Sequence, residues 1–211
     1  AAFGAFMNQG QICMSTERII VVDSVADAFI AKLTAKAGTL VAGDPREGKT
    51  PLGAVVDLHA ADHVRALVAD AVKQGASMTV GGAGEGVLIP ATVIDKVTPA
   101  MRLYSEESFG PVVAVIRVKD EEAAIAAAND SEYGLSAAVF SRDIPRALGV
   151  AKRIQSGICH INGPTVHDEA QMPFGGVKGS GYGRFGGQAG VAEFTELRWI
   201  TIETQGGHFP I

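Results

Sequence analysis

The stretch Pro111-Val112-Val113-Ala114-Val115-Ile116-Arg117-Val118 decides the fold class, because it is a nearly continuous run of apolar residues. Such a run is typical of a strand that is buried on both faces of a parallel sheet. Further short runs with strand character occur along the chain at residues 18–22, 78–80, 92–94, 136–140 and 157–161.

Helical stretches lie between these strands, and each opens at a residue that can cap a helix N-terminus. We expect helices from Ser24 to about Leu40, from Asp57 to Gln74, from Asp120 to Asn129 and from Asp143 to about Ile154. Strands and helices that alternate in this way predict an α/β fold with a mainly parallel sheet and helices on both faces.

Composition excludes several classes of partner. The chain has 211 residues, a formal net charge of -5 and 47% apolar residues. This length fits one ample domain or two small ones. An acidic chain without a block of basic residues is a poor candidate for nucleic-acid binding. No apolar run approaches the roughly 18 residues of a membrane span, so we expect no membrane partner.

Cysteine use and the first residues predict the compartment. Cys13 and Cys159 are too few for a disulfide framework. Residues 1–6 lack the basic region and the cleavage site of a signal peptide. We therefore expect a soluble protein of a reducing compartment, the cytoplasm. The chain also opens without an initiator Met and in helix-like composition, as we expect of a piece cut from something longer.

Cys13 is a candidate nucleophile. It closes the stretch Asn8-Gln9-Gly10-Gln11-Ile12-Cys13, in which Gly10 lets the backbone turn tightly. A reactive thiolate needs backbone amides, a cation or a helix end for stabilisation, together with access to substrate. The residues alone leave open an inert buried thiol at this position. Cys159 is predicted to be a core residue, and it cannot easily cooperate with His160 because neighbours in a strand point to opposite faces.

Two further patterns resemble metal or nucleotide sites, but we expect neither ligand there. His59 and His63 have a spacing that can bind a metal on a helix, yet no third ligand accompanies them. We therefore predict surface histidines and no metal site. Gly181-Tyr182-Gly183-Arg184-Phe185-Gly186 matches a dinucleotide-binding fingerprint, but no strand precedes it, so it is predicted to be a loop.

The turn before the buried strand carries adjacent carboxylates at Glu106 and Glu107. They project in different directions and are therefore not expected to act as a paired acid and base. One of them could accept hydrogen bonds from a ligand hydroxyl at the C-terminal side of the sheet. A solvated turn that ends in Gly110-Pro111 is the alternative that the residues alone leave open.

Residues 197–203 have strand character but no neighbouring strand in the sequence. A strand without a local partner usually pairs with a remote one, often in another subunit. We therefore expect a homo-oligomer that forms through this C-terminal strand.

Three motifs, in the right order, resemble the aldehyde dehydrogenase superfamily. Residues 8–13, followed by Arg18, resemble its active-site cysteine signature, residues 106–111 its E-E-x-F-G-P motif, and residues 173–181 its P-F-G-G-x-K-x-S-G loop. Residues 162–169 are similar to the aromatic-aldehyde branch, which includes salicylaldehyde, benzaldehyde and vanillin dehydrogenases. The resemblance covers essentially the whole chain. It implies the catalytic domain of that family over residues 1–190 and an oligomerisation segment over residues 191–211.

The resemblance implies a role for each site residue. Cys13 is the implied nucleophile, which forms a thiohemiacetal with the aldehyde and, after hydride transfer to NAD(P), a thioester that water hydrolyses. Its backbone N–H is an implied donor to the oxyanion. Glu107 is implied to hold the nicotinamide ribose hydroxyls, with Phe109 packed near the nicotinamide. The implied substrate-binding residues, which suit an aromatic ring, are Ile12, Val166, His167 and Phe174.

The resemblance also implies that part of the enzyme is missing from this sequence. In the family, residues before the cysteine signature supply the dinucleotide-binding domain, an oxyanion Asn, a cofactor-binding Lys and a general-base Glu. We therefore expect this chain alone to bind no NAD(P) and to oxidise little aldehyde. The alternative hypothesis is a cofactor-independent esterase or thioesterase that uses Cys13, because attack on an ester needs no hydride acceptor. A third hypothesis is a non-catalytic assembly module.

Overall fold

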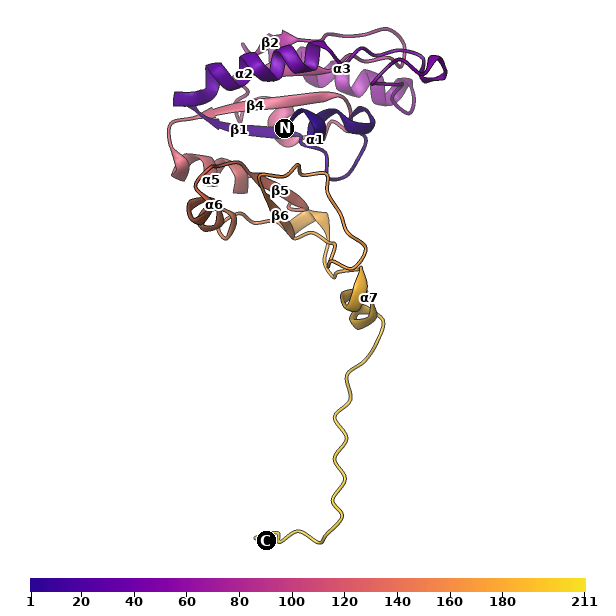
Figure 1. Cartoon of the computed structure of the whole chain (residues 1–211), viewed down its shortest axis with the longest axis vertical. Coiled ribbons are helices and arrows are strands. Elements are labelled where there is room, and N and C mark those ends of the chain that lie inside the picture. The colour runs from indigo at the N-terminus through magenta and orange to yellow at the C-terminus, as the bar shows by residue number, and fades with distance from the viewer.

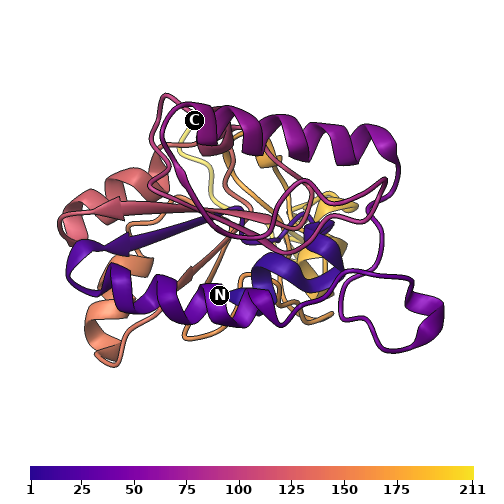
Figure 2. The same cartoon turned by 90° about the horizontal axis from the view of Figure 1, so that it is seen from above.

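The computed structural model describes all residues from 1 to 211 and places a four-stranded sheet in the upper body of the molecule (Figures 1 and 2). The strands are β1 (Arg18–Val22), β2 (Ser77–Val80), β3 (Thr92–Asp95), β4 (Val112–Val118), β5 (Ser136–Val139) and β6 (Ile158–Ile161). The main sheet has the order β1-β4-β3-β2, and β5 pairs with β6 in a second sheet. Only β2 is antiparallel to its neighbour, so the prediction of mainly parallel pairing is confirmed, but the strands are divided between two sheets.

Helices connect the strands, and none of them is both long and apolar enough to cross a membrane. The α-helices are α1 (Ala2–Phe6), α2 (Asp23–Gly38), α3 (Leu58–Lys73), α4 (Arg102–Ser105), α5 (Glu121–Asn129), α6 (Ile144–Ala151) and α7 (Gly187–Glu193). Short 3-10 helices are η1 (Met7–Gly10), η2 (Pro45–Glu47) and η3 (Lys178–Ser180).

The predicted helix caps are correct with one exception. Asp57, Asp120 and Asp143 each accept a hydrogen bond from a backbone N–H in the first turn of the helix that they precede. The prediction that Ser24 caps the next helix is wrong, because α2 already begins at Asp23 and its N-cap residue is Val22. Strand β1 runs directly into α2, so no residue lies between them to serve as a polar cap.

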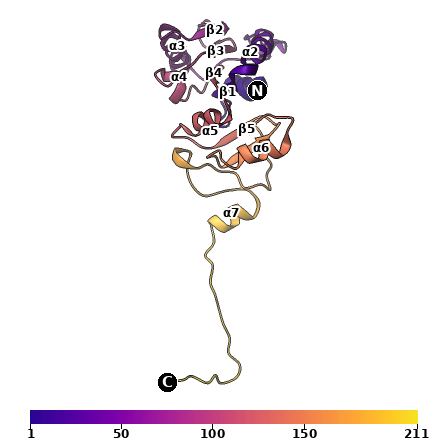
Figure 3. The same ribbon diagram turned by 90° about the vertical axis from the view of Figure 1, so that its left-hand side faces the viewer.

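Strand β4 lies at the centre of the core, with β1 and β3 on its two sides. Val113 and Val115 pack with residues of α1 and α2, while Val112, Ala114 and Ile116 pack with residues of α3 and α4. None of these five side chains is more than 5% exposed. Figure 3 shows α2 and α3 on opposite faces of the sheet. The predicted burial of this strand, and the predicted helices on both faces, are therefore confirmed.

The smaller sheet lies next to the main one and carries the segments that follow it in sequence (Figure 1). Helix α6 packs on β5 and β6, and helix α5 packs on β1 and β4. The chain therefore crosses from the main sheet to the smaller one through α5, and it returns toward the first residues through the loop that follows β6.

The C-terminal residues leave the body of the molecule after α7 (Figure 1). Leu197, Trp199 and Ile202 are 103%, 91% and 84% exposed. The strand predicted at residues 197–203 is not formed within a single chain, because a β-strand requires a hydrogen-bonded neighbour and none is present. The domain boundary between residues 190 and 191 stays a prediction, and α7 runs across it.

Candidate active site

Cys13 lies on an exposed turn that follows α1 and η1. The Ser15 N–H closes this turn by donating to the Ile12 carbonyl at 2.8 Å. The Gln11 side chain anchors it by accepting from the Val56 N–H at 2.8 Å. The backbone N–H of Cys13 donates to no acceptor within the protein. The alternative of a buried thiol is therefore wrong for Cys13, and its reactivity stays a prediction.

Glu17 joins the cysteine turn to the loop at residues 106–111. Its Oε2 accepts from the Ser108 N–H at 3.2 Å and from the Ser108 hydroxyl at 2.7 Å, and its Oε1 accepts from the Phe109 N–H at 3.2 Å. Burial raises the pKa of Glu17 to about 7, although the hydrogen bonds from Ser108 and Phe109 act to lower it. One half-buried carboxyl group thus holds together two of the predicted motifs.

The same two segments also meet backbone to backbone at Gly10 and Gly110. Gly10 has a φ of 71°, and a Cβ atom at this position would overlap the Gly110 carbonyl oxygen. Only glycine permits both the left-handed backbone and the close approach. The turn that carries Cys13 therefore rests directly against the residues that lead into β4.

The loop at residues 106–111 presents one free carboxylate and one open aromatic ring. Glu106 pairs with Arg102 at 2.7 Å, and His63 Nε2 donates to the Glu107 carbonyl at 2.9 Å. The side chain of Glu107 is exposed and makes no hydrogen bond within the protein. Phe109 is 41% exposed and has a φ of 47°. His63 is half-buried against this loop.

A third segment, at residues 162–167, contacts the cysteine turn through a pair of threonines. The hydroxyls of Thr16 and Thr165 lie 2.8 Å apart. Val166 is half-buried and His167 is exposed. The His167 ring meets the His160 ring edge-on, with 5.3 Å between their centroids. Val166 and His167 thus directly follow the residue that contacts the segment carrying Cys13.

Phe174 lies farther along, within the glycine-rich loop. Its ring packs on Phe185 with 4.9 Å between the centroids, and the two backbones exchange hydrogen bonds of 2.7 and 3.0 Å. No hydrogen bond joins Phe174 to the cysteine turn, so its role beside the thiol stays a prediction. The 3-10 helix η3, not a strand, precedes residues 181–186, which agrees with the interpretation of this glycine pattern as a loop.

The second cysteine has a different environment. Cys159 is half-buried on β6, and burial raises the pKa of its thiol. A raised pKa disfavours the thiolate, which is the nucleophilic form. Of the two cysteines, Cys13 is thus the one whose exposure suits a reaction with substrate.

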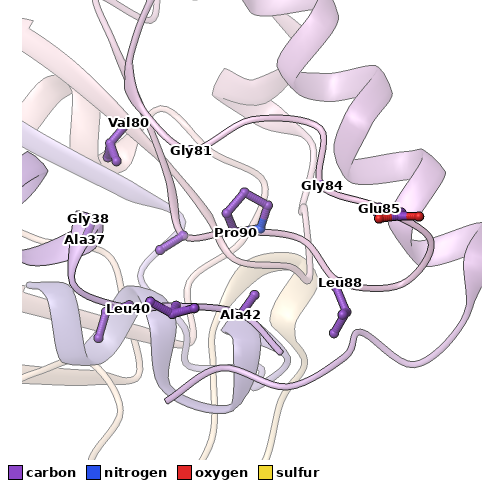
Figure 4. A pocket seen from close by; sticks show the side chains of 12 residues that line it. Ala37, Gly38, Leu40, Ala42, Val80, Gly81, Gly84, Glu85, Leu88 and Pro90 are labelled. Atoms are coloured by element: carbon purple, nitrogen blue, oxygen red, sulfur yellow. The ribbon is translucent and has the colours of Figure 1, made fainter. Parts of the chain in front are cut away.

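An open pocket of about 520 Å³ lies between the C-terminal end of α2 and the loop around Pro90 (Figure 4). Leu40, Val80 and Leu88 are among its apolar lining residues. The pocket includes none of the predicted catalytic, cofactor-binding or substrate-binding residues. The candidate active site is therefore defined by the contacts of the cysteine turn with residues 106–111 and 162–167.

Comparison with known proteins identifies the family of the chain. The model of the aldehyde dehydrogenase family matches residues 1–200. The chain belongs to this family. A vanillin dehydrogenase of Pseudomonas fluorescens is 60% identical over 211 residues, which are 100% of this chain and 44% of that protein. This aldehyde dehydrogenase chain therefore spans less than half the length of that relative.

Solved aldehyde dehydrogenase structures share the fold. A salicylaldehyde dehydrogenase from Pseudomonas putida G7, complexed with salicylaldehyde, is 48% identical with a TM-score of 0.92, and the match covers 100% of this chain and 44% of that one. An aldehyde dehydrogenase of Mycobacterium tuberculosis, complexed with NAD+, is 34% identical with a TM-score of 0.87, and the match covers 92% and 41% of the two chains. The resemblance of the sequence motifs to this family is confirmed.

Glu17 and His63 belong to the site although no sequence motif singles them out for it. Glu17 immediately precedes the β1 run, and a carboxylate at the start of a strand is the one available signal. That signal names no partner, and Ser108 lies 91 residues away. The spacing of His63 from His59 indicates only a helix face, whereas the structure places its Nε2 against the Glu107 carbonyl.

Proposed function

We propose that the chain supplies the nucleophile-bearing part of an NAD(P)-dependent aldehyde dehydrogenase that oxidises aromatic aldehydes to carboxylic acids. The observation that carries this proposal is the exposed Cys13 turn, held against the loop of Glu107 and Phe109 by Glu17 and by the close approach of Gly10. Membership of the aldehyde dehydrogenase family supports it.

Cys13 carries the covalent chemistry. Its thiolate sulfur forms a bond to the aldehyde carbon while the carbonyl electron pair moves to oxygen, which gives a thiohemiacetal oxyanion. The free Cys13 N–H donates to this oxyanion and stabilises it. Loss of the hydride from the same carbon leaves a thioester. Water then adds to the thioester, the carbon–sulfur bond breaks, and the acid and the thiol are released.

The loop at residues 106–111 fits the nicotinamide half of a dinucleotide. The Glu107 carboxylate has no partner in the protein, so its oxygens can accept hydrogen bonds from ribose hydroxyls. The exposed ring of Phe109 offers an apolar surface to the nicotinamide. When bound, NAD(P)+ supplies the hydride acceptor. The Mycobacterium tuberculosis relative complexed with NAD+ supports this assignment.

The substrate-binding residues of this proposal are Ile12, Val166, His167 and Phe174. Ile12 is half-buried beside Cys13, and Val166 follows the threonine pair that joins the third segment to the cysteine turn. Apolar and aromatic side chains of this kind suit a benzene ring. The relatives named vanillin dehydrogenase and salicylaldehyde dehydrogenase support an aromatic aldehyde.

Steady-state turnover by the intact enzyme tests the proposal. Vanillin and salicylaldehyde are expected to give a higher kcat/KM than butanal. Cys13→Ala is expected to lose at least about 10³-fold in turnover, while the matched control Cys159→Ala keeps it. Undiminished turnover in Cys13→Ala contradicts the nucleophile, and equal or better turnover of butanal contradicts the aromatic substrate.

Ester hydrolysis is a second candidate activity, because the Cys13 thiol and its free N–H both belong to this chain. The reaction needs a thiolate, an oxyanion donor and water, but no hydride acceptor. We expect hydrolysis of p-nitrophenyl acetate without nucleotide, at a rate that falls in Cys13→Ala. Equal rates for the two proteins exclude Cys13 from ester hydrolysis.

We further propose that residues 191–211 form the contact between copies of the protein. Leu197, Trp199 and Ile202 are exposed apolar side chains, and full burial of one such side chain contributes about 1.5–3 kcal/mol. Light scattering is expected to give a smaller mass for a variant that ends at residue 194. An unchanged mass contradicts this role for the segment.

A further inference from the structure

Glu17 carries a half-buried carboxyl group that the proposed chemistry does not use. Its two oxygens accept three hydrogen bonds, and all three donors belong to Ser108 and Phe109. A buried carboxylate is unfavourable unless such hydrogen bonds compensate for the lost water. The position of this carboxyl group under one particular loop therefore points to a role in holding that loop.

Residues 106–111 need an anchor because they belong to no helix or strand. Helix α4 ends at Ser105 and strand β4 begins at Val112. Within the loop, Phe109 has a φ of 47°, a left-handed conformation that is strained for a residue with a side chain. The N–H groups of Ser108 and Phe109 both donate to Glu17 instead of to a backbone carbonyl. Backbone hydrogen bonds reach the two ends of the loop, at Glu106 and Pro111, and the Glu17 carboxyl group thus holds its centre.

Other contacts hold different parts of the same loop. His63 donates to the Glu107 carbonyl, and Arg102 pairs with the Glu106 carboxylate. Neither of these side chains hydrogen-bonds Ser108 or Phe109. Glu17 is therefore the side chain that links the centre of the loop to the segment carrying the nucleophile.

We propose that Glu17 is a positioning residue, whose carboxylate fixes Glu107 and Phe109 for binding the nicotinamide ribose in register with Cys13. This inference rests on the proposed function, because it takes the cofactor role of Glu107 and Phe109 from there. Glu17 lies four residues after Cys13, so a single short segment supplies both the nucleophile and the anchor of the cofactor loop.

Two substitutions of Glu17 remove its hydrogen bonds to the loop to different extents. Glu17→Gln keeps the size but replaces one oxygen by an NH2 group. In one amide orientation this group faces the Ser108 N–H, and in the other it faces the Phe109 N–H, so one backbone donor loses its acceptor either way. Glu17→Ala removes the acceptor for both. The matched control is Glu122→Gln, because Glu122 is an exposed carboxylate that pairs with Arg153.

Hydrogen exchange of the intact enzyme without nucleotide tests the anchor directly. Peptides that cover residues 106–110 are expected to exchange faster in Glu17→Gln and faster still in Glu17→Ala, with peptides of β4 unchanged. Glu122→Gln is expected to match the wild type. The melting temperature of each variant is measured as well, to show whether the variant is folded. If Glu17→Ala is unfolded, the test uses Glu17→Gln alone. Unchanged exchange in residues 106–110 of Glu17→Gln overturns the inference.

Steady-state kinetics tests the consequence for the cofactor. The KM for NAD+ is expected to rise roughly 10- to 100-fold in Glu17→Ala and less in Glu17→Gln, while the KM for the aldehyde changes less than about 2-fold. A merely structural role lowers the amount of active enzyme and therefore kcat, and leaves both KM values unchanged. Faster loop exchange with an unchanged KM for NAD+ overturns the cofactor role of Glu107 and Phe109, whereas unchanged exchange overturns the anchor alone.

Discussion

Replacing Gly10 by Ala tests the contact that seats the cysteine turn against the loop before β4. Gly10 has a φ of 71°, and its Cβ position overlaps the Gly110 carbonyl oxygen. Gly48 provides a matched control, because it has a φ of 67° and no atom within 4 Å of its Cβ position. The two substitutions share a left-handed backbone and differ in the close approach.

The expected loss of stability follows from these differences. For Gly48→Ala, the left-handed conformation costs about 1–2 kcal/mol, and restriction of the unfolded chain offsets about 0.4–1 kcal/mol of this. The net loss is therefore about 1 kcal/mol. Gly10→Ala must also push the cysteine turn away from Gly110, and loss of one charged hydrogen bond to Glu17 adds about 1.5–3 kcal/mol. The total for Gly10→Ala is about 2.5–4 kcal/mol.

Urea unfolding of the wild type and of both variants measures these values. Gly10→Ala is expected to lower the free energy of unfolding by about 2 kcal/mol more than Gly48→Ala does. Aldehyde turnover is expected to fall in Gly10→Ala and to stay at the wild-type level in Gly48→Ala. Equal losses of stability refute the close approach of the two backbones, and full turnover in Gly10→Ala refutes its role in the site.

Three further predictions concern stability and substrate binding. The pKa of Glu17 is raised in the folded state, so its contribution to stability is full below about pH 4.5 and disappears as the pH rises through about 7. The free energy of unfolding, measured with urea, should therefore be lower at about pH 8 than at about pH 5 by roughly 2–3 kcal/mol more in the wild type than in Glu17→Gln. The same decrease in Glu17→Gln contradicts the assignment of this pH dependence to Glu17. Leu67 is 0% exposed, so Leu67→Ala should lower the free energy of unfolding by about 2–5 kcal/mol. Leu58→Ala, at a 59% exposed position of the same helix, should lower it much less, and similar losses in the two variants contradict the described core. Thr165→Val removes the hydroxyl contact with Thr16, so the KM for the aldehyde should rise while the KM for NAD+ does not; the opposite pattern contradicts the placement of the third segment at the substrate side.

Local chemistry explains which parts of the fold could be predicted. The caps at Asp57 and Asp120 and the buried run of β4 depend on neighbouring residues, and the structure confirms them. Ser24 is not a cap because β1 continues into α2 without a turn, which nothing in the residues indicates. The division into two sheets depends on pairing between distant strands, which a single sequence does not encode locally.

The sequence predicts the individual motifs of the candidate site but not the contacts that join them. The motifs identified Cys13 and Glu107, yet the contacts that join their segments span 91 residues from Glu17 to Ser108 and 149 from Thr16 to Thr165. No periodicity or spacing reports contacts over such separations. The strand predicted at residues 197–203 has the same physical limit, because a strand forms only beside another strand that offers hydrogen bonds.

The most direct test of Cys13 as the nucleophile is peptide mapping by mass spectrometry. The intact enzyme is mixed with p-nitrophenyl acetate, quenched early and digested. We predict an acetyl group on the peptide that contains Cys13, none on the peptide that contains Cys159, and no acetylated peptide from Cys13→Ala. An acetyl group on another side chain, or hydrolysis that persists in Cys13→Ala, contradicts the account.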